Sequence, residues 1–372
     1  MVKSLEDIGK RVMAARKDLG LTQTDLATAL RMERTAISKI ETGLRGIDAL
    51  ELAQLAQVLR RPIGWFLSDP SSSVVSRRDD REGIVRREDV ELEALALDVE
   101  QLVKLGVLDP PALATPPVDS IAAAEPAALK ARALAELADH EPVWDLVRVA
   151  ERLGLYAFVL PMDRGEAPEL DGSYVALQRG GVALISADSD SGRRRFTIAH
   201  ELGHHVLADA YSTEWVVGTG ATEREKIINA FAIHFLMPRA AIGPRWKKFR
   251  GDADPRGAAI RLAVEFGMSW SAACAQLHRV GCLTDQLHAT LAPQKPTSVD
   301  YLERELTIRN DGSPPTVPPR YAAAVLRALN KGKLGRTRAV ELLHGTVLEI
   351  DLPAEKPVPL EAMAAELEPL PR

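Results

Sequence analysis

The stretch RFTIAHELGH, residues 195–204, contains the pattern His-Glu-x-x-His. Residues four apart lie on one face of a helix, so His200 and His204 are expected side by side. Two imidazoles placed in this way can bind one zinc ion, with Glu201 beside the water that completes the site. The apolar residues of the stretch form one arc of the helix, and both histidines stand at its edge. The stretch therefore predicts a packed helix that turns two metal ligands towards a cleft.

A third ligand is expected from a following element, because catalytic zinc sites take three protein ligands. The segment 222–238 has the pattern of a helix that Pro238 helps to end. Within it, Glu225 shares a stripe with apolar residues and Glu223 points to the opposite side, so Glu225 is the candidate ligand. One alternative stays open: Thr222-x-x-Glu225 also has the spacing of a capping box, which would make Glu225 structural.

Other polar residues near these helices have weaker assignments. Asn229 lies one turn after Glu225 and either fixes the tautomer of a ligating histidine or is a buried amide. His234, on the outer flank, is expected to be structural. His205 falls on the far side of the first helix and is expected to be solvated. His205 and Tyr211 are both possible donors to an oxyanion, and the sequence does not choose between them.

The same segments resemble the ImmA/IrrE metallopeptidases. The resemblance spans roughly residues 125–285 and rests on these stretches: 195–197, 200–204, 225–229, 231–238, 171–174 and 181–186. It implies a gluzincin-like site in which His200, His204 and Glu225 bind Zn2+ and Glu201 is the catalytic general base. It also implies a role in controlling transcription by cleavage of a repressor.

Composition limits the class of protein. The chain of 372 residues is long enough for two or three domains, and 46% of its residues are hydrophobic. A net charge of −5 argues against general binding of polyanions. The two cysteines, Cys274 and Cys282, have no metal-type spacing and fit a reducing compartment. No apolar run is long enough to cross a bilayer, so a cytoplasmic protein with no membrane partner is expected.

The first seventy residues predict a helix-turn-helix. Thr22 and Asp25 form a helix start, and residues 34–42 form the next helix, which ends at Gly43. Short polar and basic side chains on an exposed helix face suit base edges and phosphates in a major groove. The candidate DNA contacts are Gln23, Arg34, Thr35, Ser38 and Lys39.

The pattern of these residues resembles the XRE, or lambda-repressor-like, DNA-binding family over roughly residues 5–69. Residues 1–70 hold eleven Lys or Arg and nine Asp or Glu, a surplus of only two positive charges. That surplus is small for a DNA-binding domain, although contact with phosphates depends on local charge. A bundle used for dimerisation or protein contact is the alternative. Double-stranded DNA is the expected partner, and a homodimer would match paired half-sites.

The remaining segments have simpler interpretations. Residues 70–89 are expected to be a solvated linker, and 85–105 to be a helix that packs on another domain or a second chain. Strands are expected at 155–160, 173–178 and 182–186, the last two as a hairpin. An extended peptide substrate could join such a sheet by strand addition. Arg193, Arg194 and Arg195 begin the zinc helix, where positive charge opposes the helix dipole. Nearby acids such as Asp188 and Asp190 are expected to offset their charge; the alternative is that the arginines serve a substrate.

The predicted fold class is α+β and mostly α: a five-helix bundle, a helical linker, a gluzincin-like domain with a small sheet, and a helical C-terminal region. The expected domains are 1–69 for DNA binding, 70–124 as linker and connector helix, 125–250 as zinc peptidase, 251–289 as a helix-turn-helix-like unit, and 290–372 without an assigned role. The functional hypothesis is a DNA-binding zinc endopeptidase that cleaves a repressor or antitoxin-like protein. The alternative is a non-proteolytic XRE-type regulator or antitoxin with a structural or sensory metal site.

Overall fold

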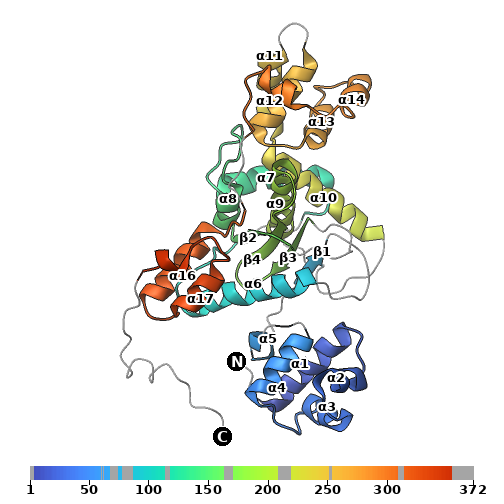
Figure 1. The fold of residues 1–372 in the computed structure, drawn as a ribbon. Helices are drawn as coiled ribbons and strands as arrows, with labels where there is room; N and C mark the ends of the chain where they lie inside the picture. Colours follow the sequence, from blue (N-terminus) through green and yellow to red (C-terminus); the bar gives the residue numbers. More distant parts are fainter. Residues whose placement is uncertain are drawn as a thin grey trace.

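The protein is described by a computed structural model (Figure 1). The structure describes these residues: 4–59, 61, 63–67, 74–77, 87–113, 118–162, 171–207, 219–250, 254–308 and 314–353. Helices dominate the described chain and a small sheet stands at its centre, so the predicted fold class is confirmed.

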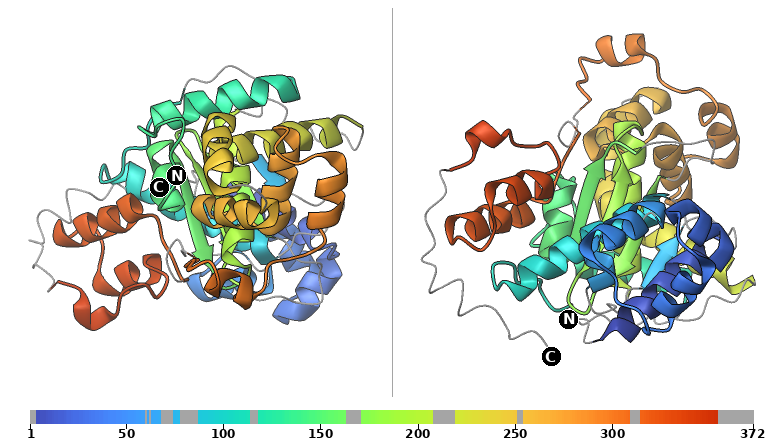
Figure 2. Two further views of the ribbon diagram at one scale, coloured as in Figure 1. Left: turned by 90° about the horizontal axis from the view of Figure 1, so that it is seen from above. Right: turned by 60° about the horizontal axis from the view of Figure 1, so that its bottom comes forward.

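The N-terminal helices form a bundle with its own core. They are α1 (Leu5–Asp18), α2 (Gln23–Leu30), α3 (Arg34–Glu41), α4 (Ala49–Val58) and α5 (Ile63–Leu67). Thr22 and Asp25 cap α2 reciprocally, as the sequence predicted, and Asp48 caps α4 in the same way with Glu51. The buried side chains of this bundle form a hydrophobic cluster separate from the rest of the protein. Figures 1 and 2 show the bundle (blue) as a distinct body beside the sheet-containing part.

The sheet has four strands in the order β1-β3-β4-β2. They are β1 (Val74–Arg77), β2 (Leu155–Leu160), β3 (Gly172–Ala176) and β4 (Gly181–Ser186). The predicted hairpin is the antiparallel pair β3 and β4, and β2 runs parallel to β4. β1 was not predicted: it lies in the segment expected to be a solvated linker and pairs antiparallel with β3.

The two faces of the sheet are covered by different helices. On one face, residues such as Leu155 and Ala157 pack with α9 (Ser191–Val206) and α10 (Thr219–Leu236). On the other, Tyr156 and Phe158 pack with α6 (Arg87–Lys104) and the C-terminal helices. All six residues of β2 are buried, as expected for a strand covered on both faces. The helix expected at 85–105 is α6, and it packs on this sheet.

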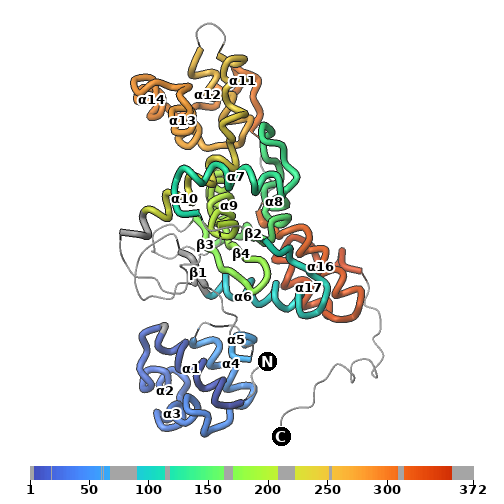
Figure 3. The backbone as a smooth tube through the Cα atoms, turned by 180° about the vertical axis from the view of Figure 1, so that it is seen from behind, coloured from blue at the N-terminus to red at the C-terminus, as the bar shows by residue number. Residues whose placement is uncertain are grey.

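The C-terminal helices α16 (Pro319–Asn330) and α17 (Arg336–Leu342) complete that second face. Seen from behind, they lie beside α6 (Figure 3). No side chain of its own caps α16, but the buried Glu151 accepts hydrogen bonds from the backbone N–H groups of Arg320 and Tyr321, both 2.9 Å. A carboxylate at a helix N-terminus satisfies donors that the helix itself cannot. Glu151 thus anchors the C-terminal region to α8 (Leu146–Arg152).

The remaining helices gather near the start of α9. They are α7 (Ile121–Leu134), α11 (Arg239–Arg250), α12 (Pro255–Phe266), α13 (Trp270–Arg279), α14 (Asp285–Leu291) and α15 (Ser298–Leu302), and a 3-10 turn, η1 (Glu349–Asp351), follows α17. The helix-turn-helix-like unit expected at 251–289 contains α12 and α13. In Figure 2 the unit containing α11 to α14 (orange) and the helices α16 and α17 (red) lie on different sides of the sheet.

Acidic side chains offset the charge of Arg193 and Arg194 at the start of α9, as the sequence predicted, although Asp171 takes part as well as Asp190. Arg193 pairs with Asp171 at 2.8 Å, and Arg194 donates to the carbonyls of Ala187 and Ser189. Asp190 acts as the N-cap through the backbone N–H of Arg193.

Arg195 is buried, which sequence reasoning missed. It donates to the carbonyl oxygens of Val143, at 2.5 Å, and Gly267, at 3.1 Å. Burial lowers its pKa to about 10. Arg195 therefore ties the metal-motif helix to the α12–α13 unit through main-chain acceptors rather than through an acid.

No single helix among the described residues is long and apolar enough to cross a membrane. Residues Glu223–Leu236 and Arg239–Arg250 meet the length and composition criteria only as a pair, bent by 53°.

Candidate metal centre

The helix that carries the motif is positioned by close packing against α10. Gly203 faces α10 between the two histidines of the motif, and a Cβ there would lie 3.1 Å from side-chain atoms of both Ile228 and Phe231. Glycine therefore lets the two helices approach closely. This approach brings the first turns of the described part of α10 over the face of α9 that bears His200 and His204.

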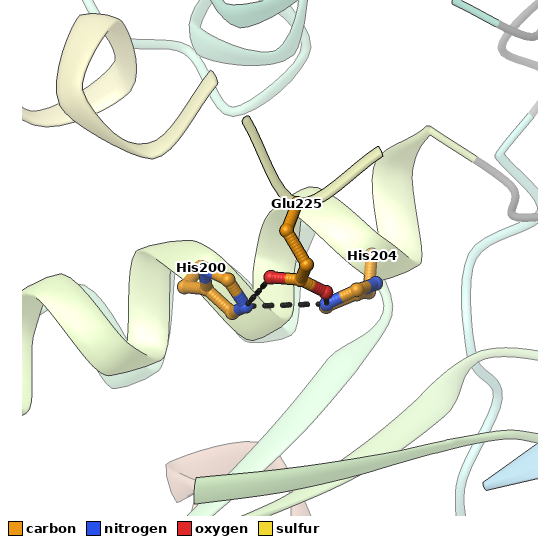
Figure 4. A group of neighbouring side chains, drawn as sticks. All are labelled: His200, His204 and Glu225. Atoms are coloured by element: carbon orange, nitrogen blue, oxygen red, sulfur yellow. Dashed lines mark hydrogen bonds and ion pairs between the residues drawn. The ribbon is translucent and has the colours of Figure 1, made fainter. Parts of the chain in front are cut away.

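The two histidines and Glu225 converge on one point (Figure 4). His200 Nε2 and His204 Nε2 are 3.2 Å apart. Glu225 Oε2 lies 3.3 Å from the first of these atoms, and Oε1 lies 3.4 Å from the second. Among the described residues, these three side chains are the one group of His, Cys, Asp or Glu that is placed to hold a metal ion.

The donor separations fit a small tetrahedral cation. For bonds of about 2.0–2.1 Å to such an ion, neighbouring ligand atoms lie about 3.3–3.4 Å apart. The two imidazole nitrogens are 3.2 Å apart, and each lies 3.3–3.4 Å from a different oxygen of Glu225, so the carboxylate spans the pair. One ligand atom from each residue lies within 4.8 Å of the other two, which leaves room for one such ion. Two nitrogens and one carboxylate are also a ligand set that zinc accepts while keeping a position open.

Asn229 lies where it can orient one of these ligands. Its Oδ1 accepts a hydrogen bond of 3.1 Å from Nδ1 of His200. With a metal ion bound, a neutral imidazole that donates from Nδ1 would present its lone pair on Nε2, the atom that faces Glu225 and His204. The amide is thus placed as a hydrogen-bond partner of the outer ring nitrogen of a ligand histidine.

The electrostatics of Glu225 favour its charged form. Burial by itself would raise the pKa of this carboxyl, but hydrogen bonds and charge interactions with His200 and His204 outweigh it. The pKa of Glu225 therefore lies well below its ordinary value. Its side chain is 28% exposed, whereas the two imidazoles are 1% and 2% exposed, so solvent reaches the group from the Glu225 side.

The capping-box alternative for Glu225 does not match the helix. α10 begins at Thr219, so Thr222 lies inside the helix rather than at its N-cap. The competing acid, Glu223, is exposed and pairs with Lys226 at 2.6 Å, away from the histidines. His234 is buried near Gln276 and Glu125, in the structural position that was expected.

Glu201, the proposed base, is buried at the edge of β3. Its exposed fraction is 2%. A Cβ added to Gly172 would lie 3.2 Å from Glu201 Oε1 and 2.5 Å from Cγ2 of Thr197. Gly172 therefore provides the space that this carboxylate occupies, so the first residue of β3 and the catalytic candidate are immediate neighbours.

Tyr174 is a neighbour of the site that sequence reasoning missed. Its ring stacks on His204, with centroids 6.3 Å apart and planes inclined by 13°. Its hydroxyl donates to Nδ1 of His205 at 3.1 Å, and Nε2 of His205 donates to the carbonyl of Leu153 at 2.9 Å. In the sequence, Tyr174 was noted only as part of a resemblance, because a strand tyrosine gives no local signal of what it packs against.

The expectation that His205 is solvated was wrong. It is half-buried and has hydrogen bonds on both ring nitrogens, and burial lowers its pKa to about 4. Because both ring nitrogens are already bonded, His205 has no free N–H group to donate to an oxyanion. Tyr211, the other candidate, lies outside the described residues.

The N-terminal candidates for DNA contact have different environments. Arg34, Thr35 and Lys39 on α3 are exposed, and Ser38 is half-buried. Gln23 Nε2 donates to Glu41 Oε2 at 2.9 Å, and the buried Glu41 is also paired with Arg16. Arg34, Thr35 and Lys39 are therefore accessible to a partner, whereas the amide nitrogen of Gln23 is already bonded to Glu41.

Two family models match the chain. Residues 150–278 match the model described as IrrE N-terminal-like domain, of the M78 peptidase family, and residues 12–66 match the helix-turn-helix model. The chain joins an XRE-type helix-turn-helix domain to an IrrE-like domain. Both resemblances drawn from the sequence are thereby confirmed. The IrrE-like match includes all of α9 and α10, and hence the three converging side chains.

Comparisons with individual proteins add little to the family matches. No curated protein matches the chain. A solved structure described as a Mycobacterium tuberculosis transcriptional regulator is 16% identical, with a TM-score of 0.32, and the match covers 50% of this chain and 50% of that one. The match thus spans about half the length of that protein, and a structural likeness of this degree supports no conclusion about function.

Proposed function

We propose that the protein is a DNA-binding regulator whose IrrE-like domain is a zinc metalloendopeptidase that cleaves a repressor or antitoxin-like protein. The observation that supports this most strongly is the convergence of His200, His204 and Glu225 at donor separations that suit zinc, with Glu201 on the same helix. The family matches supply the two coarser parts, a peptidase-family domain and a helix-turn-helix domain.

The proposed roles divide among the residues of the site. His200, His204 and Glu225 would hold Zn2+, and Asn229 would keep His200 in the tautomer that binds it. When bound, zinc acts as a Lewis acid and lowers the pKa of water towards about 7. Glu201 would accept a proton from the attacking water on its carboxylate and pass that proton to the leaving amine.

The buried environment of Glu201 suits that role. A carboxylate with an exposed fraction of 2% has few waters to compete for its proton, and its electrostatic interactions are strong in a low-dielectric site. Gly172 sets the position of Oε1 by leaving room for it. β3 would thus fix the base, and α9 and α10 would fix the ligands.

The helix-turn-helix domain supports DNA binding, and the exposed side chains of α3 are the proposed contacts. Arg34 and Lys39 would contact phosphates, and Thr35 and Ser38 would approach base edges. Gln23 is retained as a proposed contact through its amide oxygen, because the amide nitrogen already binds Glu41. Attachment to DNA would place the peptidase near proteins bound at the same locus, and two half-sites would call for a homodimer.

One observation favours the alternative of a non-proteolytic regulator. Both imidazoles are almost fully buried, with exposed fractions of 1% and 2%, so a substrate could approach the metal only from the side of Glu225. In that case the ion would stabilise the packing of α9 on α10, or report metal availability to the DNA-binding domain, without hydrolysis.

The decisive experiment compares wild type with Glu201→Gln. Each metal-loaded protein is incubated with the products of neighbouring genes, and new termini are sought by mass spectrometry. We expect wild type to cut one of them and Glu201→Gln to be slower by roughly 10²–10⁴-fold while keeping its metal. Equal cleavage by the two proteins, or no cleavage of any product by either, would favour the non-proteolytic regulator.

A further inference from the structure

One edge of the sheet is part of the metal centre. Tyr174 of β3 stacks on His204, and Gly172 of β3 borders Glu201 Oε1. An extended peptide bonded to the outer edge of β3 would therefore lie one strand spacing, about 4.8 Å, beyond a strand that touches two residues of the site. The opposite edge is formed by β2, where Val159 exchanges two backbone hydrogen bonds of 2.9 Å with Thr316.

The outer edge of β3 is occupied by the chain itself. β1 comes from the segment between the DNA-binding bundle and α6, and it runs antiparallel to β3. Its register pairs Val74 with Ala176 and Arg77 with Ser173. The chain in β1 therefore runs from the Ala176 end of β3 towards the Gly172 end, where Glu201 lies. Figure 1 shows β1 beside β3 at the margin of the sheet.

We propose that β1 is a strand supplied in cis that occupies the substrate-accepting edge, so that an extended segment of the target protein must displace it before cleavage. This proposal rests on the proposed peptidase function and adds two things to it. The substrate would bind as an extended segment antiparallel to Ser173–Ala176, and release of β1 would regulate its access. Main-chain hydrogen bonds supply most of the affinity in strand addition, so β1 competes whatever its side chains are.

The competition is intramolecular. A segment joined to its binding site by a short length of chain has an effective concentration on the order of millimolar. A target protein at micromolar concentration is then at a disadvantage of roughly 10²–10³-fold until β1 is released. A strand of four residues adds few hydrogen bonds, so the restraint is weak enough to be reversible.

The same segment is the covalent connection to the DNA-binding bundle. Only residues 68–73 separate the last residue of α5, Leu67, from the first residue of β1, Val74. At about 3.3–3.6 Å per residue, such a connection spans at most about 20–25 Å. A change in the position of the bundle, on binding DNA or a second copy, would therefore act directly on the occupant of the β3 edge.

The test measures hydrogen exchange in full-length, metal-free protein carrying Glu201→Gln, so its outcome does not depend on hydrolysis. The variant is Val75→Pro/Ser76→Pro. Amides alternate in direction along a strand, so two adjacent prolines must remove one N–H that faces β3. The matched control, Val75→Ala/Ser76→Ala, keeps both N–H groups. A second variant replaces residues 74–77 with glycines. The probe is a synthetic peptide of residues 72–79, added in trans.

We expect the outward-facing amides of Ser173–Ala176 to exchange at least 10-fold faster in the proline variant than in the control, with β2 and β4 unchanged. The peptide should bind the proline variant at least 10-fold more tightly than the control and restore the protection of β3. Equal exchange in the proline and alanine proteins, with the glycine variant in agreement, would overturn the proposal. Faster exchange with no peptide-dependent protection of β3 would also overturn it, because the edge would then not accept an added strand. These measurements do not involve hydrolysis, so failure of the proposed peptidase function would not change either result.

Discussion

At the scale of single residues, the site depends on three side chains from two helices. His200 and His204 come from one helix face, but Glu225 belongs to a second helix and reaches them only because Gly203 permits close packing. Their ligand atoms approach one another to 3.2–3.4 Å. Two imidazoles and a carboxylate are groups that bind a divalent cation well, so a metal ion is the expected occupant. The neighbours Asn229 and Tyr174 hold the two imidazoles in place.

Removing the amide next to His200 should weaken the metal site without abolishing it. In Asn229→Ala the Nδ1 of His200 loses its acceptor, so the ring can rotate and change tautomer. We expect zinc affinity to fall by roughly 10–100-fold, measured by competition with a chromophoric chelator. Asn330→Ala, an exposed amide at the end of α16, is the control and should match wild type. Unchanged affinity in Asn229→Ala would show that the amide has no part in positioning the ligand.

At the scale of elements, α3 is the helix whose exposed side chains fit DNA. Its apolar side is buried through Ile37 and Ile40, which leaves Arg34, Thr35 and Lys39 accessible. The buried Glu41 of α3 accepts a hydrogen bond from Gln23 of α2 and pairs with Arg16 of α1, so it ties α3 to both preceding helices. This geometry gives α3 a rigid base.

Substitution of the basic residues of α3 should weaken binding to DNA and reduce its salt dependence. Arg34→Ala/Lys39→Ala would remove up to two phosphate contacts, so the slope of log K against log salt should fall by about one to two units. The measurement is fluorescence anisotropy with DNA from the upstream region across a salt series. Lys10→Ala, an exposed α1 residue paired with Glu6, is the control. Equal slopes for all three proteins would remove α3 as the DNA-contacting element.

The contact between α6 and α17 should depend on pH. Asp98 of α6 pairs with Arg338 of α17, yet burial raises the pKa of Asp98 to about 6 even though the charge of Arg338 opposes that rise. A raised folded-state pKa means that stability is fully present below the unfolded pKa, about 4, and is lost as pH rises through about 6. Wild type should therefore lose on the order of 1–3 kcal/mol relative to Asp98→Asn between pH 4.5 and 7.

Urea unfolding at several pH values measures this difference. Asp119→Asn, at an exposed position before α7, serves as the control and should follow wild type at every pH. If the free energy of unfolding changes with pH in the same way in wild type and Asp98→Asn, the pKa of Asp98 is not raised in the folded state. The contact between α6 and α17 would then not depend on pH.

At the scale of the whole molecule, the C-terminal region without an assigned role completes the core. Val317, Tyr321, Val325 and Leu329 are buried in the cluster that includes α6 and the outer face of β2. Glu151 and the Asp98–Arg338 pair add polar connections between the same parts.

Truncation before this region should therefore damage the peptidase-family domain. A chain that ends at residue 315 leaves the face of α6 and β2 exposed, and each large apolar side chain returned to water costs about 1.5–3 kcal/mol. We expect loss of soluble protein or of cooperative thermal unfolding. A chain that ends at residue 353 keeps every contact described above and should unfold like wild type. A cooperative, equally stable 1–315 fragment would show that the C-terminal helices are dispensable.

Local signals explain which parts of this molecule could be predicted from its sequence. The helices α9 and α10 and the caps of α2 and α4 follow from spacing within a few residues, so their elements and the converging face of α9 were predictable. β1 was not predictable, because four residues between a serine run and a charged run form a strand only through pairing with β3, about a hundred residues away. The buried state of Arg195 was missed for the same reason: its acceptors are carbonyls of distant loops.

The central claim is that His200, His204 and Glu225 form one metal site. The most direct measurement is the zinc content of purified protein by mass spectrometry, after dialysis against chelator-treated buffer, for wild type, His204→Ala, Glu225→Gln and the control Glu223→Gln. We predict about one zinc per chain in wild type and Glu223→Gln, and strongly reduced zinc in His204→Ala and Glu225→Gln. Zinc content that is the same in all four proteins, or absent from wild type, would contradict the account.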